Sequence, residues 1–287
     1  MSVARGELLR DRIRLRADRL SPAQRRLAEY ILQNAHRVAF MTAAELGEAV
    51  GVSESTVVRF ATALGYSGYP EMQRELQEAI WSQLTARDRM ELARTSPSSS
   101  VVEQVLREDI ENLRATLREV SREAFAQAVE ALHTARHVYL AGFRGAATIA
   151  HYLAFYLSFI RKDVYRLQEA GAVFEQLVTL NSEDLVVLIS FPRYSRLTVD
   201  IAEFARERGA RTLALTDSVL SPIARLADIT LVARTQLTSY VDSLAAPLSL
   251  ASALLTALAL KDRERTQQVL AELERIWAKY HIYTVES

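Results

Sequence analysis

Two short segments in the second half of the chain combine arginine with hydroxyl side chains. The first is GFRGAAT (142–148) and the second is SFPRYS (190–195). Together they supply the candidate ligand-binding residues Arg144, Thr148, Ser190, Arg193 and Ser195. Guanidinium groups bind phosphate through paired donors, and the amino end of a helix adds backbone N–H groups. We interpret the two segments as a site for a small anion. The alternative is that they are exposed loops that carry arginine without a ligand.

Each of these segments follows a short apolar run of the kind that forms a buried strand. Such runs, bounded by polar residues and mostly separated by helical patterns, occur at 137–143, 163–168, 184–191, 211–217 and 229–233. This alternation predicts an α/β domain with a doubly wound parallel sheet that is covered on both faces. In a flavodoxin-like strand order, ligands bind beyond the carboxyl ends of the first and third strands, where the order reverses. We therefore expect both arginine segments at one edge of the sheet.

A second set of candidate residues lies between Thr42 and Gly65, in a stretch that reads as helical. A helix-turn-helix needs a small residue where its helices cross and a turn residue that tolerates unusual backbone angles, roles that suit Gly47 and Gly51. The interhelical core is predicted at Leu46, Val50, Val52, Val57 and Phe60. Ser53 is expected to cap the second helix, whose exposed amino-terminal half enters the major groove in such motifs. The DNA-binding candidates are Ser53, Glu54, Ser55, Thr56 and Arg59. An ordinary helical hairpin is the alternative.

The charge of the chain is uneven although its formal total is zero. Residues 1–26 contain eight arginines against three acidic residues, and the remainder is net acidic. A basic segment of this kind suits contact with the phosphates of nucleic acid, and a solvated amphipathic helix is the simpler alternative. We expect these arginines to position the helix-turn-helix on the DNA backbone.

Turn and capping signals divide the chain into domains. Ser21–Gln24 and Thr42–Glu45 have the pattern of capping boxes, and GYSGYP (65–70) precedes a helix expected from about Glu71 to Leu84. TSPSSS (95–100) has the composition of a linker, and Ser221–Pro222 has that of a helix start. The predicted organisation is an all-α helix-turn-helix domain (1–85), a linker and connecting helix (86–120), an α/β domain (121–262) and a C-terminal helix (263–287).

Several classes of site are not expected. The chain has no cysteine, which excludes disulfides, thiolate zinc sites and cysteine nucleophiles. Its histidines form no metal-binding pair, and the acids near the anion segments, Glu169 and Asp242, have no visible partner for general base catalysis. The amino terminus lacks a secretory pattern, and the apolar run 244–260 is shorter than a membrane span and favours a buried helix. We expect a cytoplasmic protein without catalytic residues, metal, cofactor or membrane contact.

Three blocks of sequence resemble the RpiR-type bacterial transcriptional regulators. They are SPAQRRLAEYIL (21–32), AAELGEAVGVSESTVVRFATALGYSGYPEM (43–72) and LALTDSVLSPIARLADITL (213–231). The resemblance implies an N-terminal helix-turn-helix joined to a C-terminal sugar isomerase (SIS) domain. It also implies homodimers or homotetramers on a palindromic operator in double-stranded DNA, with a sugar phosphate or related metabolite altering the affinity.

The two anion segments depart from the loops that are usual in SIS domains. Those loops follow the patterns GxGxS and SxSGxT, whereas here Arg144 replaces the second glycine and Ala146 the serine of the first pattern. Residues 190–195 keep only the first and last hydroxyl residues of the pattern SxSGxT, as Ser190 and Ser195. The leading hypothesis is a DNA-binding regulator whose SIS-like domain senses a phosphosugar or another anionic metabolite. The alternatives are a phosphosugar isomerase, and a SIS domain that serves only as an oligomerisation scaffold.

Overall fold

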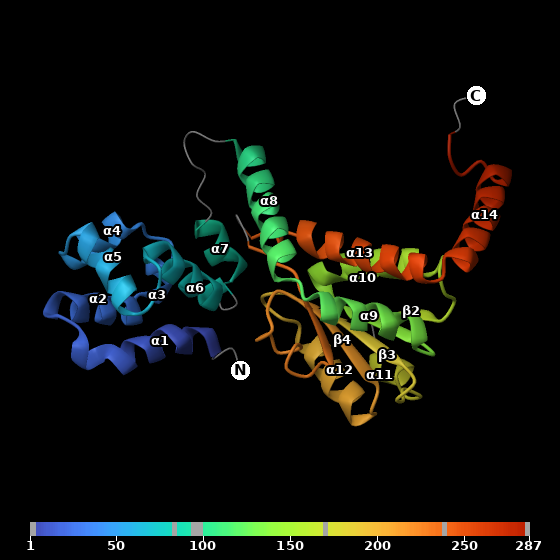
Figure 1. The fold of residues 1–287 in the computed structure, drawn as a ribbon, viewed down its shortest axis with the longest axis horizontal. Helices are drawn as coiled ribbons and strands as arrows, with labels where there is room; N and C mark the ends of the chain where they lie inside the picture. Colours follow the sequence, from blue (N-terminus) through green and yellow to red (C-terminus); the bar gives the residue numbers. More distant parts are fainter. Residues whose placement is uncertain (1–3, 82–84, 93–99, 169–171, 237–239, 285–287) are drawn as a thin grey trace. The chain divides into compact units, whose positions relative to one another are not determined.

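The computed structural model describes residues 4–81, 85–92, 100–168, 172–236 and 240–284, and the chain divides into two compact units (Figure 1). The first unit spans Met1–Arg94 and the second spans Thr95–Ser287. The predicted linker residues 95–99 lie outside the described residues. The connecting helix α8 (Val101–Glu119) belongs to the second unit, and α7 (Ala86–Leu92) belongs to the first.

The first unit is helical throughout its described residues. Its other elements are α1 (Ala4–Arg16), a 3₁₀ turn (Ala17–Arg19), α2 (Pro22–Gln33), α3 (Ala35–Val38), α4 (Ala43–Val50), α5 (Glu54–Ala63) and α6 (Tyr69–Trp81). Both predicted capping boxes are present, at the starts of α2 and α4. In the second, the backbone N–H of Thr42 donates to Oε2 of Glu45 over 2.7 Å. Helix α6 begins two residues before its predicted start, and residues 82–84 lie outside the described residues.

Helices α4 and α5 form the predicted helix-turn-helix. A Cβ atom at Gly47 would lie 2.7 Å from the carbonyl oxygen of Val52, so only glycine permits this close approach. Gly51 ends α4 in the left-handed region, with φ of 71°. The predicted interhelical core is confirmed: Leu46, Val57 and Phe60 are fully buried, and Val50 and Val52 are packed against them.

In the described part of the second unit, the chain forms a five-stranded parallel sheet. Its strands are β1 (Val138–Gly142), β2 (Val164–Arg166), β3 (Leu185–Ile189), β4 (Arg211–Thr216) and β5 (Ile229–Val232). The strand order is β2-β1-β3-β4-β5, which is the predicted flavodoxin-like order, and all pairs are parallel. Each strand lies within its predicted apolar run, so the pattern of apolar and polar residues was sufficient to identify all five strands.

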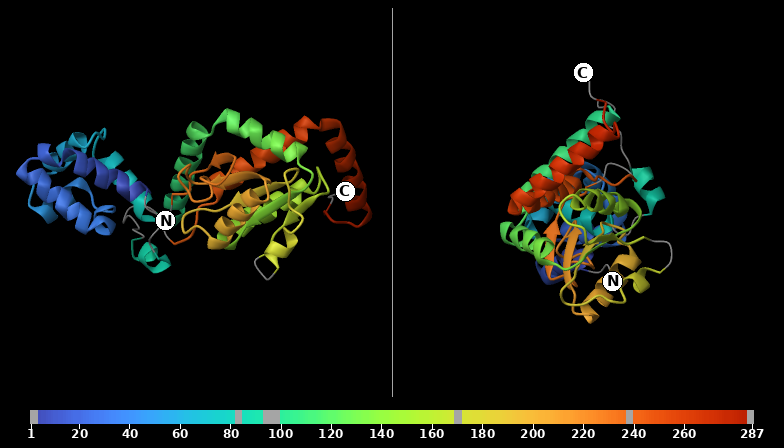
Figure 2. Two further views of the ribbon diagram at one scale, coloured as in Figure 1. Left: turned by 90° about the horizontal axis from the view of Figure 1, so that it is seen from below. Right: turned by 90° about the vertical axis from the view of Figure 1, so that its right-hand side faces the viewer.

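Helices cover both faces of this sheet (Figures 1 and 2). One face carries α9 (Arg122–Thr134), α10 (Ala147–Leu157) and α13 (Ala245–Lys261), and the other carries α11 (Val173–Gln176) and α12 (Arg196–Glu207). Alternate strand residues enter the two cores: Val138 and Leu140 face the first layer, whereas Tyr139 and Ala141 face the second. The strands are therefore apolar on both sides, as doubly wound sheets require.

Two C-terminal features complete the unit. The apolar run near the end forms the buried helix α13, as predicted, and α14 (Arg263–Lys279) follows it directly. Among the described residues no single helix is long and apolar enough to cross a membrane. In this part of the chain, one pair of helices, α13 and α14, passes that test together, and the pair is bent by 105°.

The predicted helix start at Ser221–Pro222 is wrong. The Oγ of Ser221 accepts the backbone N–H of Ala224 over 3.2 Å, as a helix cap does, but the chain continues only as turns. Ile223 is fully buried and β5 begins at Ile229. The few residues between this anchor and the strand leave no room for a helix, so the capping signal closes a turn instead.

Candidate functional site

The two arginine segments meet at the carboxyl edge of the sheet. β1 and β3 are neighbours, and their last residues, Gly142 and Ile189, are aligned in register. A 3₁₀ turn (Arg144–Ala146) leads from β1 into α10, and residues 190–195 lead from β3 into α12. The strand order reverses here, so the sequence correctly predicted that both loops lie together at the switch point.

Both arginines stand in the left-handed region of backbone space. The φ angle is 54° at Arg144 and 68° at Arg193, and both side chains are exposed. This conformation costs an L-residue roughly 1–2 kcal/mol relative to glycine. In the SIS loop patterns both positions carry glycine. The sequence therefore replaces glycine with arginine at two backbone positions of the kind that glycine favours, and each replacement adds an exposed guanidinium group.

The hydroxyls of the second loop hold its backbone in place. Ser190 is buried, and its Oγ accepts the backbone N–H of Ser195 over 3.1 Å. The Oγ of Ser195 in turn accepts the N–H of Thr198 and caps α12. These bonds shape the loop rather than face solvent, so the two serines would contribute to an anion site chiefly by fixing the position of Arg193.

The 3₁₀ turn provides acceptors for the first backbone N–H groups at the start of α10. The N–H of Ala146 donates to the carbonyl of Phe143, and the N–H of Ala147 donates to the carbonyl of Arg144. Thr148 is exposed in the first turn of α10. Arg144 and the Thr148 hydroxyl therefore lie about one helical turn apart in the chain.

Acidic residues are also present at this edge. The Asp242 carboxylate lies close to Gly145: a Cβ built on that glycine would be 3.0 Å from it. Tyr194 donates its hydroxyl proton to Asp217 over 2.8 Å. Glu169, the other acid expected here, lies outside the described residues. Within the described ranges, no group of three or more His, Asp or Glu residues could hold a metal ion.

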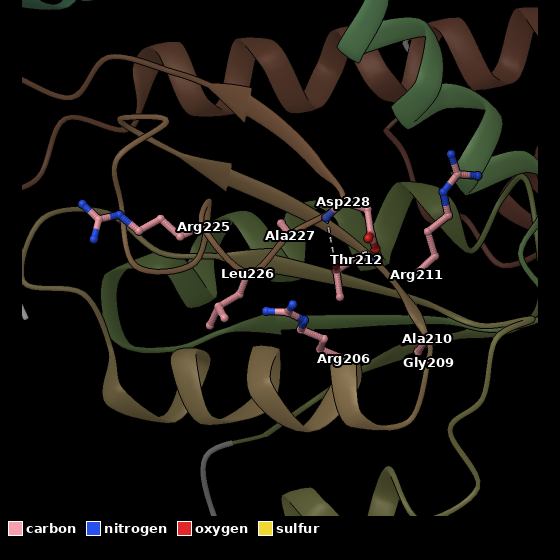
Figure 3. Close-up of a pocket in the computed structure, with 9 residues that line it drawn as sticks. All are labelled: Arg206, Gly209, Ala210, Arg211, Thr212, Arg225, Leu226, Ala227 and Asp228. Carbon is pink, nitrogen blue, oxygen red and sulfur yellow. Dashed lines mark hydrogen bonds between the residues drawn. The ribbon is translucent and has the colours of Figure 1, made fainter.

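A pocket of about 570 Å³ lies at the opposite, amino edge of the sheet (Figure 3). It is lined by three arginines, Arg206, Arg211 and Arg225, but Figure 3 shows Arg211 and Arg225 extending away from it to opposite sides. Its carboxylate, Asp228, already accepts the backbone N–H and the hydroxyl of Thr212, each over 2.8 Å. The polar groups of this pocket do not converge, so we do not assign the ligand site to it.

A buried ion pair at the same amino edge of the sheet was not predicted from the sequence. Asp184 precedes β3, is 1% exposed and accepts two hydrogen bonds of 3.0 Å from Arg136. The backbone N–H of Asn181 donates to it, and Nδ1 of His137 lies 2.9 Å from its Oδ1. Burial acts to raise the pKa of Asp184, but these hydrogen bonds outweigh burial and the pKa is lowered overall. In the sequence, the only sign of this ion pair is that Asp184 stands at the start of the apolar run 184–191.

The DNA-binding candidates form one connected group at the amino end of α5. The Oγ of Ser53 lies 3.0 Å from that of Ser55 and 2.8 Å from the hydroxyl of Thr56. Arg59 donates to the carbonyl of Ser55 and to the Thr56 hydroxyl, over 3.3 and 3.4 Å. Ser53 is the N-cap residue, as predicted, but its side chain binds these hydroxyls and accepts no backbone N–H. Glu54 is exposed beside the group.

Part of the basic N-terminal segment stabilises the helical unit. Arg12 and Arg16 both donate to the carbonyl of Leu64, and Arg12 also stacks over the ring of Tyr66 at 4.5 Å. Arg25 donates to the carbonyl of Leu20 over 3.2 Å. Three other arginines of the segment are exposed, namely Arg14, Arg19 and Arg26. The side chains of Arg5 and Arg10 lie outside the description. The expectation that all eight contact phosphate is therefore too broad.

Comparison with known proteins places both units in one family. Residues 7–83 match the helix-turn-helix domain of the rpiR family, and residues 131–257 match the SIS domain. The transcriptional regulator HexR of Pseudomonas aeruginosa is 30% identical over 225 residues, which is 78% of each chain.

Solved structures that share the fold include the following two. One is the sugar isomerase domain of an RpiR transcription factor from Sphaerobacter thermophilus, which is 37% identical with a TM-score of 0.60. It covers 62% of this chain and 99% of its own. The other is the NanR protein of Vibrio vulnificus in complex with ManNAc-6P, 24% identical with a TM-score of 0.60 over 95% of this chain and 98% of its own. The chain therefore belongs to the RpiR family of helix-turn-helix transcriptional regulators and carries the SIS domain of that family.

Proposed function

We propose that this regulator binds a small anionic metabolite, a phosphosugar in the first instance, between the loops that follow β1 and β3. The observation that carries the proposal is the pair Arg144 and Arg193, which are exposed, hold left-handed backbone angles and extend from adjacent strand ends. Strained non-glycine residues persist where the surroundings impose them, and they cluster at ligand sites. The likeness to the NanR protein of Vibrio vulnificus in complex with ManNAc-6P supports the same class of ligand.

Thermal unfolding in the presence of sugar phosphates and inorganic phosphate tests this site. We expect at least one sugar phosphate to raise the unfolding temperature of the wild type, and Arg144→Ala and Arg193→Ala to remove that increase. Arg196→Ala is the matched control, because Arg196 is also exposed near the second loop but pairs with Asp200 over 2.7 Å. A wild-type protein that no member of the panel stabilises would favour the scaffold alternative.

The DNA-binding surface is proposed at the amino end of α5. Ser53, Glu54, Ser55, Thr56 and Arg59 lie on its exposed half, and the exposed arginines of the N-terminal segment are proposed to contact phosphates. Arginine reads guanine through two hydrogen bonds, and loss of such a contact costs about 1–3 kcal/mol of discrimination.

Gel-shift titration against operator and random DNA tests this surface. Arg59→Ala should lower the ratio of the two affinities, by up to roughly 150-fold for the upper end of that range. Thr62→Ala is the control on the same helix, since its hydroxyl donates to the carbonyl of Val58. A ratio that is equal in Arg59→Ala and wild type would remove Arg59 from base recognition.

We also propose that the SIS domain binds its ligand without converting it. HexR of Pseudomonas aeruginosa, which matches 78% of this chain, is a transcriptional regulator, and this supports a binding role for the domain. Incubation of the purified protein with each stabilising sugar phosphate, followed by NMR, should show no isomerisation. Turnover would restore the enzyme alternative.

The remaining proposals concern assembly and place of action. The regulator acts in the cytoplasm as a homodimer or homotetramer on a palindromic operator. Residues 1–85 bind DNA, residues 86–120 connect, residues 121–262 bind the effector, and residues 263–287 form the C-terminal helix. Footprinting of the bound operator should reveal two half-sites related by two-fold symmetry, because a symmetric dimer presents two copies of α5.

A further inference from the structure

The long helix α8 contacts its own unit through polar residues. Asn112 is 2% exposed and makes a pair of hydrogen bonds with the backbone of Gln236, of 3.0 and 2.8 Å. One turn later, the hydroxyl of Thr116 accepts the backbone N–H of Arg234 over 2.8 Å. The helix also packs against α13 in this region (Figure 1). The face of α8 that is turned toward the α/β domain is therefore fixed by specific hydrogen bonds.

An apolar stripe runs along a different side of α8 and is exposed in this chain. The stripe consists of Val102 (67% exposed), Leu106 (56%), Ile110 (45%), Leu113 (37%) and Leu117 (79%). At about 100° per residue, these positions fall within a sector roughly 80° wide along the helix. A helix buries such a stripe against another element, and here the described part of the second unit offers none. A contiguous exposed apolar surface of this kind marks an interaction site.

The charges on α8 indicate what covers the stripe. Its exposed charges are Glu103, Arg107 and Glu111 in the first half, and Arg114, Arg118 and Glu119 in the second. Glu108 is partly buried, and Asp109 accepts the hydroxyl of Ser243 in its own unit over 2.6 Å. The exposed charge of α8 is therefore net negative in the first half and net positive in the second. Two copies of α8 that run antiparallel would place the acidic half of each along the basic half of the other, with Glu103 of one copy near Arg114 and Arg118 of the other. A parallel pair would align like charges and the helix dipoles. The charge pattern therefore matches a second copy of the same helix in antiparallel orientation.

We infer that α8 is a dimerisation helix: the stripe Val102–Leu117 packs against the stripe of a second copy, antiparallel and two-fold symmetric about Ile110. This inference deepens the proposed homo-oligomer by naming its contact surface. In this dimer, the two effector-binding units are joined through α8, the helix that follows the DNA-binding unit in the chain. A ligand that alters the packing of α8 would thus act on the spacing of the two DNA-binding units.

Cross-linking of single cysteines tests the geometry, and the absence of native cysteine makes every link assignable. In the full-length protein, Ile110→Cys should form a covalent dimer on oxidation or with a short bismaleimide. Glu111→Cys is the control, since the adjacent position points about 100° away. Val102→Cys alone should not link, because antiparallel pairing separates the two copies by about 24 Å along the axis. Mixed with Leu117→Cys, it should link.

Association is measured on the same chain by light scattering and sedimentation. The double variant Leu106→Glu/Leu113→Glu should weaken dimerisation by at least about 100-fold, because four apolar side chains lose their burial. Both residues are more than a third exposed in the single chain, so the variant should unfold at a nearly unchanged temperature. Leu260→Glu, at an exposed leucine of α13, is the control and should dimerise as the wild type does.

Two results would overturn the inference. One is a monomeric wild type, which would mean that another part of the same chain covers the stripe. The other is a dimer in which Ile110→Cys links no better than Glu111→Cys, which would place the contact elsewhere. The second result would leave the proposed operator and ligand binding intact, because those are measured separately in the Arg59 and Arg193 variants.

Discussion

Replacement of Arg193 by glycine should stabilise the ligand-free protein while it weakens ligand binding. Arg193 has φ of 68° and an exposed side chain, and among the described residues its guanidinium has no hydrogen bond or ion pair. Relief of the left-handed conformation is worth roughly 1–2 kcal/mol, and the greater freedom of glycine in the unfolded chain returns about 0.5–1 kcal/mol of that. The net expected gain is about 0.5–1 kcal/mol.

This gain is measurable as a shift in unfolding temperature. For a domain of 150–250 residues, a change of 1 kcal/mol shifts Tm by roughly 2–4 °C, so Arg193→Gly should unfold about 1–4 °C above the wild type. Arg193→Ala keeps the left-handed angle and loses only the exposed guanidinium. Its Tm should therefore stay close to that of the wild type.

The ligand reverses the order of stability. At a concentration 100 times its Kd, a ligand stabilises the wild type by about 2.7 kcal/mol. Loss of one hydrogen-bonded charge costs about 1.5–3 kcal/mol, which lowers the affinity by roughly 10- to 150-fold. At the same ligand concentration, both variants should be stabilised by only about 0.3–1.4 kcal/mol, and the wild type should become the most stable of the three.

Differential scanning calorimetry of the three proteins, with and without the sugar phosphate, separates the two parts of the reasoning. If Arg193→Gly is no more stable than Arg193→Ala without ligand, the argument from backbone strain is wrong. If the ligand stabilises either variant as much as the wild type, the guanidinium does not hold the anion.

Two further predictions concern the scaffold. Gly47→Ala places a Cβ 2.7 Å from the carbonyl oxygen of Val52 and should cost about 1–3 kcal/mol in urea unfolding, and an unchanged midpoint would contradict the close crossing of α4 and α5. The folded pKa of Asp184 is lowered, so its stabilisation is fully present above the unfolded pKa of about 3.9 and is lost as pH falls through the folded value. Asp184→Asn should cost about 1.5–3 kcal/mol near neutral pH and less in acid, whereas a difference that does not change with pH would argue against an ionised Asp184 in the fold.

The sequence was sufficient for most of the fold because local signals and tertiary structure agree. The apolar runs become strands since both faces of a doubly wound sheet are buried, and the capping boxes begin α2 and α4 because their partners are three residues apart. The predicted helix start at Ser221–Pro222 was wrong because the local signal and the tertiary structure disagree there. Its capping bond forms, but the buried Ile223 and the nearby start of β5 decide the path of the chain.

The period of α8 shows the limit of pattern reasoning. Spacings of three and four identify an apolar stripe, but they do not say which element it contacts. An apolar stripe would ordinarily face the domain to which its helix belongs. Here Asn112 and Thr116 face that domain instead, through the backbone of Gln236 and Arg234, and the stripe is turned away by about 100°. The long-range partners of these two polar residues, more than 100 positions away, are invisible in the sequence.

The candidate ligand site depends on backbone angles that no side-chain pattern records. Compared with the SIS loop patterns, Arg144 and Arg193 look like the loss of two glycines, and therefore like the loss of a site. In the structure, both positions lie in the left-handed region that makes glycine favourable, and Ser190 and Ser195 still close the second loop. Propensity alone would exclude arginine from such angles. The two arginines therefore add two positive charges to loops whose backbone keeps the conformation that glycine favours. Compared with loops that carry glycine at these positions, this favours a more negatively charged ligand.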